Sequence, residues 1–274
     1  MLTTLSSERN EQLLCEWSGE ITDRHAQDFC DVCNAVFSNH FDLDYMRRKY
    51  EANIYGRSFI AVVYKNAKPI AAWGAWRNDL EGKTAFQLCD FVTLPEARKG
   101  GYVLDMFNGI CDELRKSYPE AVIYGYPGPM AYPVLKAIGF SVTDLYMRLY
   151  HGYTKDFAEN ISVIDDDYVN AFLTKKKNIC ISKIGGRYYL VQKFRIKRLI
   201  PAARILGEVS SKFSDSFRRA GGLRLYFYNS LLPGKRTARA AEYDLGASEQ
   251  VMKSVPPYYK ADGNTLDFNG RNNH

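Results

Sequence analysis

The chain has 274 residues, of which 46% are hydrophobic and 25% charged, and its net charge is +6. This length is enough to bury a sizeable core and leaves room for two domains. No apolar run reaches the length of a membrane span and the first residues do not resemble a signal peptide, so we expect a cytoplasmic protein without a membrane partner. The positive excess suits an anionic substrate or cofactor, but it is too small to indicate a nucleic-acid partner.

The first 150 residues alternate helical and β-prone segments. Apolar spacing and turn residues predict helices at 23–37, 42–50, 102–116 and 131–138, and strands at 58–64, 69–76, 85–94, 121–126 and 145–150. The strands at 58–64 and 69–76 are joined by a short turn, which predicts a β-hairpin.

The six cysteines are expected to be free thiols, since no secretory signal accompanies them. Cys30 and Cys33 have the spacing of half a zinc site, but no second pair of Cys or His residues completes it. Both fall on the apolar face of the helix predicted at 23–37. We therefore expect core residues at these two positions and no metal site.

The segment after residue 150 has a similar order of elements. Its pattern predicts helices at 165–173 and 211–220, and strands at 179–183, 187–196, 203–209 and 223–228. A hairpin, a third strand, a helix and a further strand repeat the order of the first half. We therefore expect two domains in tandem, 1–150 and 151–274; an unrelated α+β domain or a set of sheet extensions is the alternative for the second.

A short basic glycine loop separates the strand at 85–94 from the helix at 102–116. Pro95 ends the strand, and Gly100 and Gly101 precede the helix, with Arg98 and Lys99 beside them. Glycines allow main-chain N–H groups to approach a ligand closely, and a helix N-terminus favours negative charge. Strand, glycine loop and helix together predict a phosphate site.

The pattern Val92-x-x-Pro95-x-x-Arg98-x-x-Gly101 resembles the acyl-CoA motif of GNAT-family acyltransferases. Val103 stands where that family has Gly or Ala. Leu135-Lys-Ala-Ile-Gly-Phe140 resembles a later family signature, with Leu135 in place of the usual Tyr. Lys49-Tyr-x-x-Asn-x-Tyr-Gly-x-Ser58 resembles a loop of GNAT proteins encoded among bacterial surface-polysaccharide enzymes, including tandem GNAT-like sugar N-acyltransferases.

The resemblance covers residues 20–150 and implies an α+β fold, with a mixed, mostly antiparallel sheet flanked by helices. Because the second half repeats the order of elements but has no Arg-x-x-Gly-x-Gly equivalent, we expect 151–274 to be a second, degenerate GNAT-like domain without an acyl-CoA loop of its own. It implies acyl-CoA as co-substrate and no metal. The residues that it assigns to the pantetheine arm are Phe91, Val92 and Leu94, and those that it assigns to the pyrophosphate are Arg98, Lys99, Gly100, Gly101, Tyr102 and Val103.

Transfer of an acyl group to an amine needs a base for the amine and a proton donor for the leaving thiolate. Asp90 lies among apolar neighbours on the motif strand and is the candidate base; the alternative is an Asp that positions the acceptor by charge or caps a loop. The candidate proton donors are Tyr132, one helical turn before Leu135, and Tyr126.

The expected reaction is transfer of an acetyl or hydroxybutanoyl-type group to the amine of a UDP- or dTDP-linked amino sugar, in O-antigen or capsule biosynthesis. The alternatives are an N-acetyltransferase for a protein or small amine, and a GNAT-shaped CoA-binding module without catalysis. Self-association into a homo-oligomer is possible on this sequence.

Overall fold

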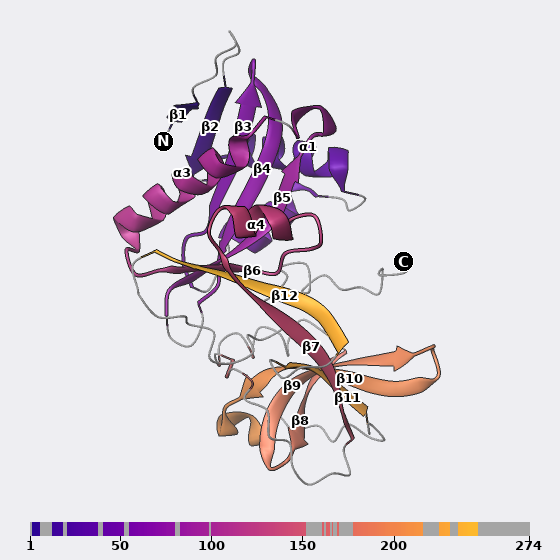
Figure 1. Cartoon of the computed structure of the whole chain (residues 1–274). Coiled ribbons are helices and arrows are strands. Elements are labelled where there is room, and N and C mark those ends of the chain that lie inside the picture. The colour runs from indigo at the N-terminus through magenta and orange to yellow at the C-terminus, as the bar shows by residue number, and fades with distance from the viewer. Residues whose placement is uncertain are drawn as a thin grey trace. The chain divides into compact units, whose positions relative to one another are not determined.

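The computed structural model describes most of the chain as two compact units (Figure 1). The described residues are 2–5, 13–18, 21–37, 41–51, 55–79, 83–98, 100–151, 161, 163–164, 166, 169, 178–215, 225–230 and 235–245. The first unit comprises 1–125, 134–140 and 242–250, and the second comprises 126–133, 141–241 and 251–274.

The first unit contains a twisted sheet in the order β1-β2-β3-β4-β5-β6. Its strands are β1 Leu2–Leu5, β2 Leu13–Ser18, β3 Phe59–Lys65, β4 Lys68–Arg77, β5 Ala85–Thr93 and β6 Val122–Gly125. All neighbours are antiparallel except β5 and β6, which run parallel. The expectation of a mixed, mostly antiparallel sheet is confirmed, while β1 and β2 were not expected.

Helices cover both faces of this sheet. They are α1 Asp23–Val36, α2 Leu43–Met46, a π-helical turn Arg47–Glu51, and α3 Tyr102–Ser117. Trp73 of β4 lies near Phe107 of α3, with ring centroids 6.3 Å apart, whereas the next residue, Gly74, faces Tyr50 of the π turn. Successive strand residues point to opposite faces, so α3 and the π turn lie on opposite sides of β4.

The predicted helices at 23–37 and 102–116 are confirmed, and each has a buried apolar face. On α1 this face includes Cys30 and Cys33, which are free thiols in the core. Among the described residues, no group of three or more His, Cys, Asp or Glu side chains is arranged to hold a metal ion. Nor does the described part of the chain include a helix long and apolar enough to cross a membrane.

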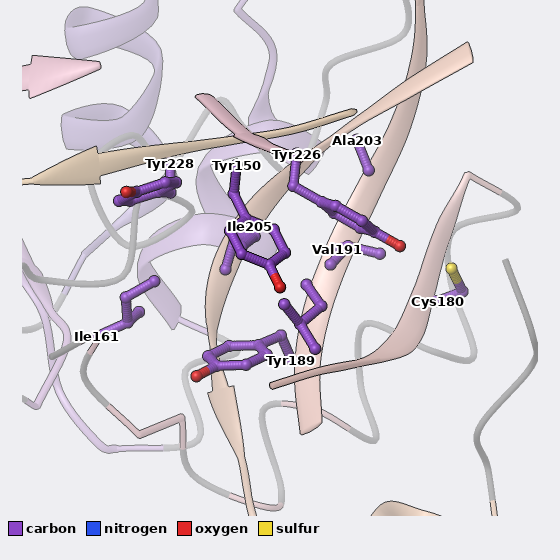
Figure 2. Packing of buried hydrophobic residues seen from close by; sticks show 10 residues of the cluster. Tyr150, Ile161, Cys180, Tyr189, Val191, Ala203, Ile205, Tyr226 and Tyr228 are labelled. Atoms are coloured by element: carbon purple, nitrogen blue, oxygen red, sulfur yellow. The ribbon is translucent and has the colours of Figure 1, made fainter. Parts of the chain in front are cut away.

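The second unit contains a sheet in the order β12-β7-β11-β10-β9-β8. Its strands are β7 Ser141–His151, β8 Ile179–Ile184, β9 Arg187–Ile196, β10 Ile200–Val209, β11 Leu225–Ser230 and β12 Lys235–Asp244. Side chains from β7 to β11 gather in a core that includes Tyr150, Tyr189 and Tyr226 (Figure 2). The strand β12 was not expected from the sequence.

The predicted helices of this half are largely outside the described residues. Of 165–173, only Asp166 and Val169 are described, both as helical. At 211–220 the structure has a short 3₁₀ turn, Ser211–Ser214, and residues 216–220 are outside the described part.

The compact units also differ from the halves expected at residue 150. The strand β7 lies in the sheet of the second unit, and residues 242–250 cluster with the first. The division into tandem domains 1–150 and 151–274 stays a prediction.

Candidate functional site

The parallel strands β5 and β6 pair over only three residues. The pairs are Ala85 with Val122, Phe86 with Ile123, and Gln87 with Tyr124. On its other edge β5 stays paired with β4 as far as Thr93. Among the described residues no strand pairs with the β6-side edge of β5 beyond Gln87, so main-chain N–H and C=O groups there face outward without a strand partner.

A buried polar network lies at the last pair of β5 and β6. The Asn78 side-chain amide donates hydrogen bonds to the Tyr124 hydroxyl, 2.7 Å away, and to the Gln87 side-chain oxygen, 3.3 Å away. All three side chains are fully buried. Because Gln87 and Tyr124 form the last β5–β6 pair, the network holds the two strands together where their pairing ends.

A β-bulge interrupts β5 just beyond that point. Ala72 of β4 lies opposite Val92 and Gly74 lies opposite Cys89, so three steps along β5 correspond to two along β4. Asp90 occupies the bulge in the left-handed region, with φ of +52°. Asp adopts this conformation more readily than most residues, and a bulge redirects the side chains and main chain around it.

The Asp90 carboxylate forms a buried ion pair with Lys49. The Lys49 Nζ lies 2.6 Å from Asp90 Oδ2, and the two side chains are only 4% and 5% exposed. The same oxygen accepts hydrogen bonds from the hydroxyls of Tyr50, at 2.7 Å, and Tyr45, at 3.3 Å. Three donors therefore compensate for the burial of one carboxylate oxygen.

The π turn and one glycine create the space for this cluster. Lys49 and Tyr50 are adjacent in the π turn, a conformation that often occurs at functional sites. A side chain at Gly74 would collide with the Tyr50 ring, which packs over the bare main chain of β4. The Tyr50 hydroxyl thereby also reaches Cys89 Sγ, 3.3 Å away.

The buried environment of this cluster raises the pKa values of Lys49, Tyr50 and Cys89. Burial lowers the pKa of Lys49, but the Asp90 carboxylate, with Cys89 and Tyr45, outweighs burial and raises that pKa well above its usual value. Burial, reinforced by Asp90, raises the pKa of Tyr50. Burial likewise raises the pKa of the Cys89 thiol to about 11. The cluster therefore keeps Lys49 charged and the phenol and thiol neutral at neutral pH.

The main chain at Asp90 is more accessible than its side chain. The residue as a whole is half-buried although its carboxylate-bearing side chain is 5% exposed. The accessible surface therefore belongs mainly to the main chain. The bulge presents its main chain to the open edge of β5 and keeps its charge inside the protein.

The glycine loop connects the open edge of β5 to the N-terminus of α3, Tyr102–Ser117. Pro95–Ala97 form a 3₁₀ turn, and Gly101 is the N-cap of α3 with φ of +77°. No side chain caps the helix, so its first N–H groups are directed toward the loop. A side chain at Gly100 would collide with the Tyr102 ring. Arg98 is exposed, and Lys99 is outside the described residues.

The structure thus brings most of the expected ligand-binding residues onto one strand edge, loop and helix start of the first unit. The described members of this set are Phe91, Val92, Leu94, Arg98, Gly100, Gly101, Tyr102 and Val103. Tyr102 is buried and Phe91 is half-buried against Trp73, with ring centroids 4.8 Å apart. Their role in binding stays a prediction.

The expected proton donor, Tyr132, lies on the short helix α4 and not on the strand edge or glycine loop described above. Tyr132 begins α4, Tyr132–Ala137, and clusters with the second unit, so its catalytic role stays a prediction. Leu135 is buried in the core. Gly139, with φ of +97°, ends α4, where the Gly139 and Phe140 N–H groups donate to the Lys136 and Leu135 carbonyls.

The sequence interpretation missed the partners of Asp90. Lys49 and Tyr50 were part of a recognised motif, but they were given no role, and Tyr45 was not noticed. The signal present in the sequence was a Tyr and a Lys one helical turn apart, at 45 and 49, with a second Tyr at 50, which is common on ordinary surface helices. The burial of Lys49 depends on its contact with Asp90, which lies 41 positions later in the sequence.

We predict strong thermodynamic coupling between Lys49 and Asp90. Lys49→Met should lower the free energy of unfolding by about 3–5 kcal/mol, because it leaves a buried carboxylate without its cation. Lys49→Met combined with Asp90→Asn should cost less than the sum of the two single changes. Chemical denaturation of the four proteins measures this coupling.

Lys212→Met is the matched control, since Lys212 pairs with Asp166 at 2.7 Å but is 78% exposed. Water screens that pair, so little change is expected. Equal losses for the Lys49 and Lys212 variants, or strict additivity of the two buried changes, would contradict the assigned pairing.

We also predict that the protein loses stability in alkali. Groups with raised folded-state pKa values keep protons that the unfolded chain releases, so stability falls as pH rises. For Cys89 the window runs from its usual 9.0 to about 11, and Lys49 and Tyr50 extend it upward. The free energy of unfolding should stay constant up to roughly pH 8.5 and fall above it. Each of these three groups adds about 1.4 kcal/mol per pH unit to the slope while it titrates.

Denaturant titrations between neutral pH and pH 11 would show this fall, about 2 pH units wide for one thiol. Cys89→Ala should make it shallower between pH 9 and about 11. A stability that is constant over this range would show that the cluster is not buried as described.

Comparisons with known proteins show the fold. No model of a known protein family matches the sequence. No curated protein matches it significantly either. Among solved structures, it is similar to a GCN5-related N-acetyltransferase from Kribbella flavida, at 14% identity and a TM-score of 0.54, over 84% of this chain and 72% of that one.

Two further solved structures match with similar sequence identity, coverage and TM-score. A GCN5-related N-acetyltransferase from Anabaena variabilis matches at 11% identity and a TM-score of 0.55, over 85% of this chain and 73% of that one. A probable N-acyltransferase from Enterococcus faecalis matches at 8% identity and a TM-score of 0.52, over 86% and 73%. The matched part of this chain is longer than either compact unit in all three comparisons, so the similarity includes parts of both units. The chain has the fold of GCN5-related N-acetyltransferases, the GNAT fold.

Proposed function

We propose that this protein is an acyl-CoA-dependent N-acyltransferase. The observation that carries the proposal is the stretch of β5 beyond Gln87, whose β6-side edge pairs with no described strand, followed in sequence by the uncapped start of α3. An open strand edge can pair with the amide groups of an extended ligand. A helix N-terminus led by glycine suits a pyrophosphate. The pantetheine arm and pyrophosphate of coenzyme A offer these two features in the same order.

In this arrangement the main chain of Phe91, Val92 and Leu94 pairs with pantetheine, and the loop from Arg98 to Val103 holds the pyrophosphate. Acyl-CoA supplies a thioester whose carbonyl carbon the acceptor amine attacks, with the thiolate leaving. Gly101 supports this placement, because its positive φ and missing side chain leave the first turn of α3 open. At position 103 the family pattern has Gly or Ala and this chain has the larger Val103, so close approach there depends on the main chain.

We assign Asp90 a positioning role in preference to that of general base. Its side chain is 5% exposed and its Oδ2 already accepts hydrogen bonds from Lys49 and Tyr50. A reactant at the open edge of β5 therefore meets the main chain of the bulge. Main-chain N–H groups held in this way can stabilise negative charge on a reacting carbonyl oxygen. Tyr132 is kept as the proposed proton donor for the thiolate.

The proposed acceptor is the amine of a UDP- or dTDP-linked amino sugar used for O-antigen or capsule, and the acyl group is acetyl or of the hydroxybutanoyl type. The net charge of +6 and 20 tyrosines support an anionic ligand that carries a flat base. The sequence segment from Lys49 to Ser58, which resembles GNAT proteins of polysaccharide loci, supports the sugar. A protein or small-amine acceptor, and a CoA-binding module without catalysis, are the rivals.

We predict that Arg98→Ala weakens coenzyme A binding about tenfold, through loss of one charge-assisted contact to phosphate. Calorimetry with coenzyme A and with pantetheine, which has no pyrophosphate, measures the effect. Pantetheine binding should be unchanged. Arg115→Ala is the matched control, because Arg115 is an exposed cation in the last turn of the same helix.

Three results would count against this placement. No coenzyme A binding up to millimolar concentration would overturn the proposed function itself. Equal weakening by Arg98→Ala and Arg115→Ala would indicate only a general charge effect. Equal weakening for pantetheine and coenzyme A would place Arg98 away from the pyrophosphate.

A thiol-release screen identifies the acceptor. It crosses acetyl-, butyryl- and 3-hydroxybutyryl-CoA with UDP- and dTDP-amino sugars, polyamines and peptides. We expect turnover with an aminodeoxy sugar nucleotide. Turnover confined to peptides or polyamines would defeat the sugar proposal and keep the enzyme class, whereas coenzyme A binding without any turnover would favour the non-catalytic module.

A further inference from the structure

The outer part of the β9–β10 hairpin extends past its neighbouring strands (Figure 1). The strand β8 pairs with β9 only as far as Gln192, and β11 pairs with β10 only at Ala203 and Arg204. Within the described chain, residues 194–202 therefore form a two-stranded ribbon with neither edge paired. Such a ribbon is marginally stable in water by itself. Among the described residues Phe227 of β11 packs against its base at Phe194, with ring centroids 5.7 Å apart, and nothing of this kind covers the tip.

Positive charge is concentrated on this hairpin. Residues 187–207 contain six Lys and Arg and no Asp or Glu, a charge equal to the +6 of the whole chain. Four of these cations are exposed near the tip: Lys193, Arg195, Lys197 and Arg198. None of the four makes an ion pair with another described residue, whereas Arg187 at the base pairs with Glu208.

Large apolar side chains are exposed beside these cations. Leu199 is 78% exposed, Ile200 50% and Phe194 39%. Ile200 lies opposite Ile196, and Phe194 opposite Ala202, so these four share one face of the ribbon. Lys193 and Arg195 lie on the other face. The ribbon is therefore amphipathic, with Leu199 at its end.

The tip residues are not explained by turn formation. Lys197 and Arg198 have φ of +47° and +63°, a conformation that hairpin turns usually give to Asn and Gly. Cations at these two positions cost local stability that a turn alone would avoid. Unusual main-chain conformations kept at such a cost are typical of functional segments.

We propose that this hairpin docks on the surface of a lipid bilayer that contains anionic lipid. Leu199, Ile200 and Phe194 enter the headgroup region, and the four cations face lipid phosphates. The expected absence of a membrane partner is thereby revised to peripheral contact, which needs no spanning helix.

Charge and side-chain chemistry favour an anionic bilayer over a second copy of the chain and over single-stranded nucleic acid. A second copy of the chain would bring four like charges against four, which opposes docking of tip on tip. Single-stranded nucleic acid is bound through aromatic rings that stack on bases. The most exposed apolar residues here are aliphatic, which suits acyl chains.

The test is flotation of the purified full chain with vesicles, either pure phosphatidylcholine or phosphatidylcholine with phosphatidylglycerol. Binding is expected only to the anionic vesicles and should weaken as salt is raised. Lys197→Gln with Arg198→Gln should reduce the affinity about twenty-five-fold, since each cation near an anionic surface contributes about a fivefold factor. Leu199→Asn with Ile200→Thr should abolish binding at every salt concentration.

Lys65→Gln with Lys68→Gln is the matched control. These lysines flank the Asn66–Ala67 turn of the β3–β4 hairpin, which also has two positive φ values but no large exposed apolar residue at its tip. This variant should bind vesicles as the wild type does. Circular dichroism of each variant checks its fold.

Several results would overturn the proposal. They are absence of vesicle binding at millimolar lipid, equal loss in the control variant, and binding of RNA in place of vesicles through the same residues. Self-association that depends on Leu199 and Ile200, without vesicle binding, would assign the hairpin to a second copy instead.

Discussion

Burial of the Asp90 carboxylate is the constraint around which the candidate site is arranged. A charge inside a protein needs a partner of opposite sign and further hydrogen bonds, and Lys49 with the two tyrosines provides them. Those partners come from the π turn, so the turn is fixed against β5. The ring of Tyr50 needs the absent side chain of Gly74, which sets the contact with β4. One buried charge thus ties a helix, two strands and a bulge together.

The open edge of β5 depends on this arrangement at one end and on the Asn78 network at the other. The network holds β5 and β6 together up to Gln87, and the bulge redirects β5 immediately beyond. Between them β5 stays paired with β4 on one edge, whereas the other edge lacks a strand partner among the described residues. An edge that is already ordered costs little conformational entropy when a ligand pairs with it, which is how pre-organisation increases affinity. The glycine loop then extends the same surface to the start of α3.

Much of the first unit was predictable because its signals are local. Helical spacing placed α1 and α3, and Pro95 with the two glycines placed the loop. The strands β1 and β2 were missed because they are short, with four and six residues, and lack clear alternation of apolar and polar residues. The strand β12 was missed because Lys235–Asp244 is mostly polar and charged, and such a strand forms through its neighbours. Lys49 was missed for the same physical reason. A lysine is nearly always exposed, and its burial follows from a carboxylate that is distant in sequence.

The most direct test of the account is hydrogen–deuterium exchange with and without saturating acetyl-CoA. If the ligand pairs with the open edge of β5 and with the start of α3, amides between residues 88 and 104 should become protected. Amides of β3 and β4, Phe59–Lys65 and Lys68–Arg77, should change little, because those strands are already paired on both edges. Saturation without protection at residues 88–104, or protection confined to other segments, would contradict the proposed ligand site.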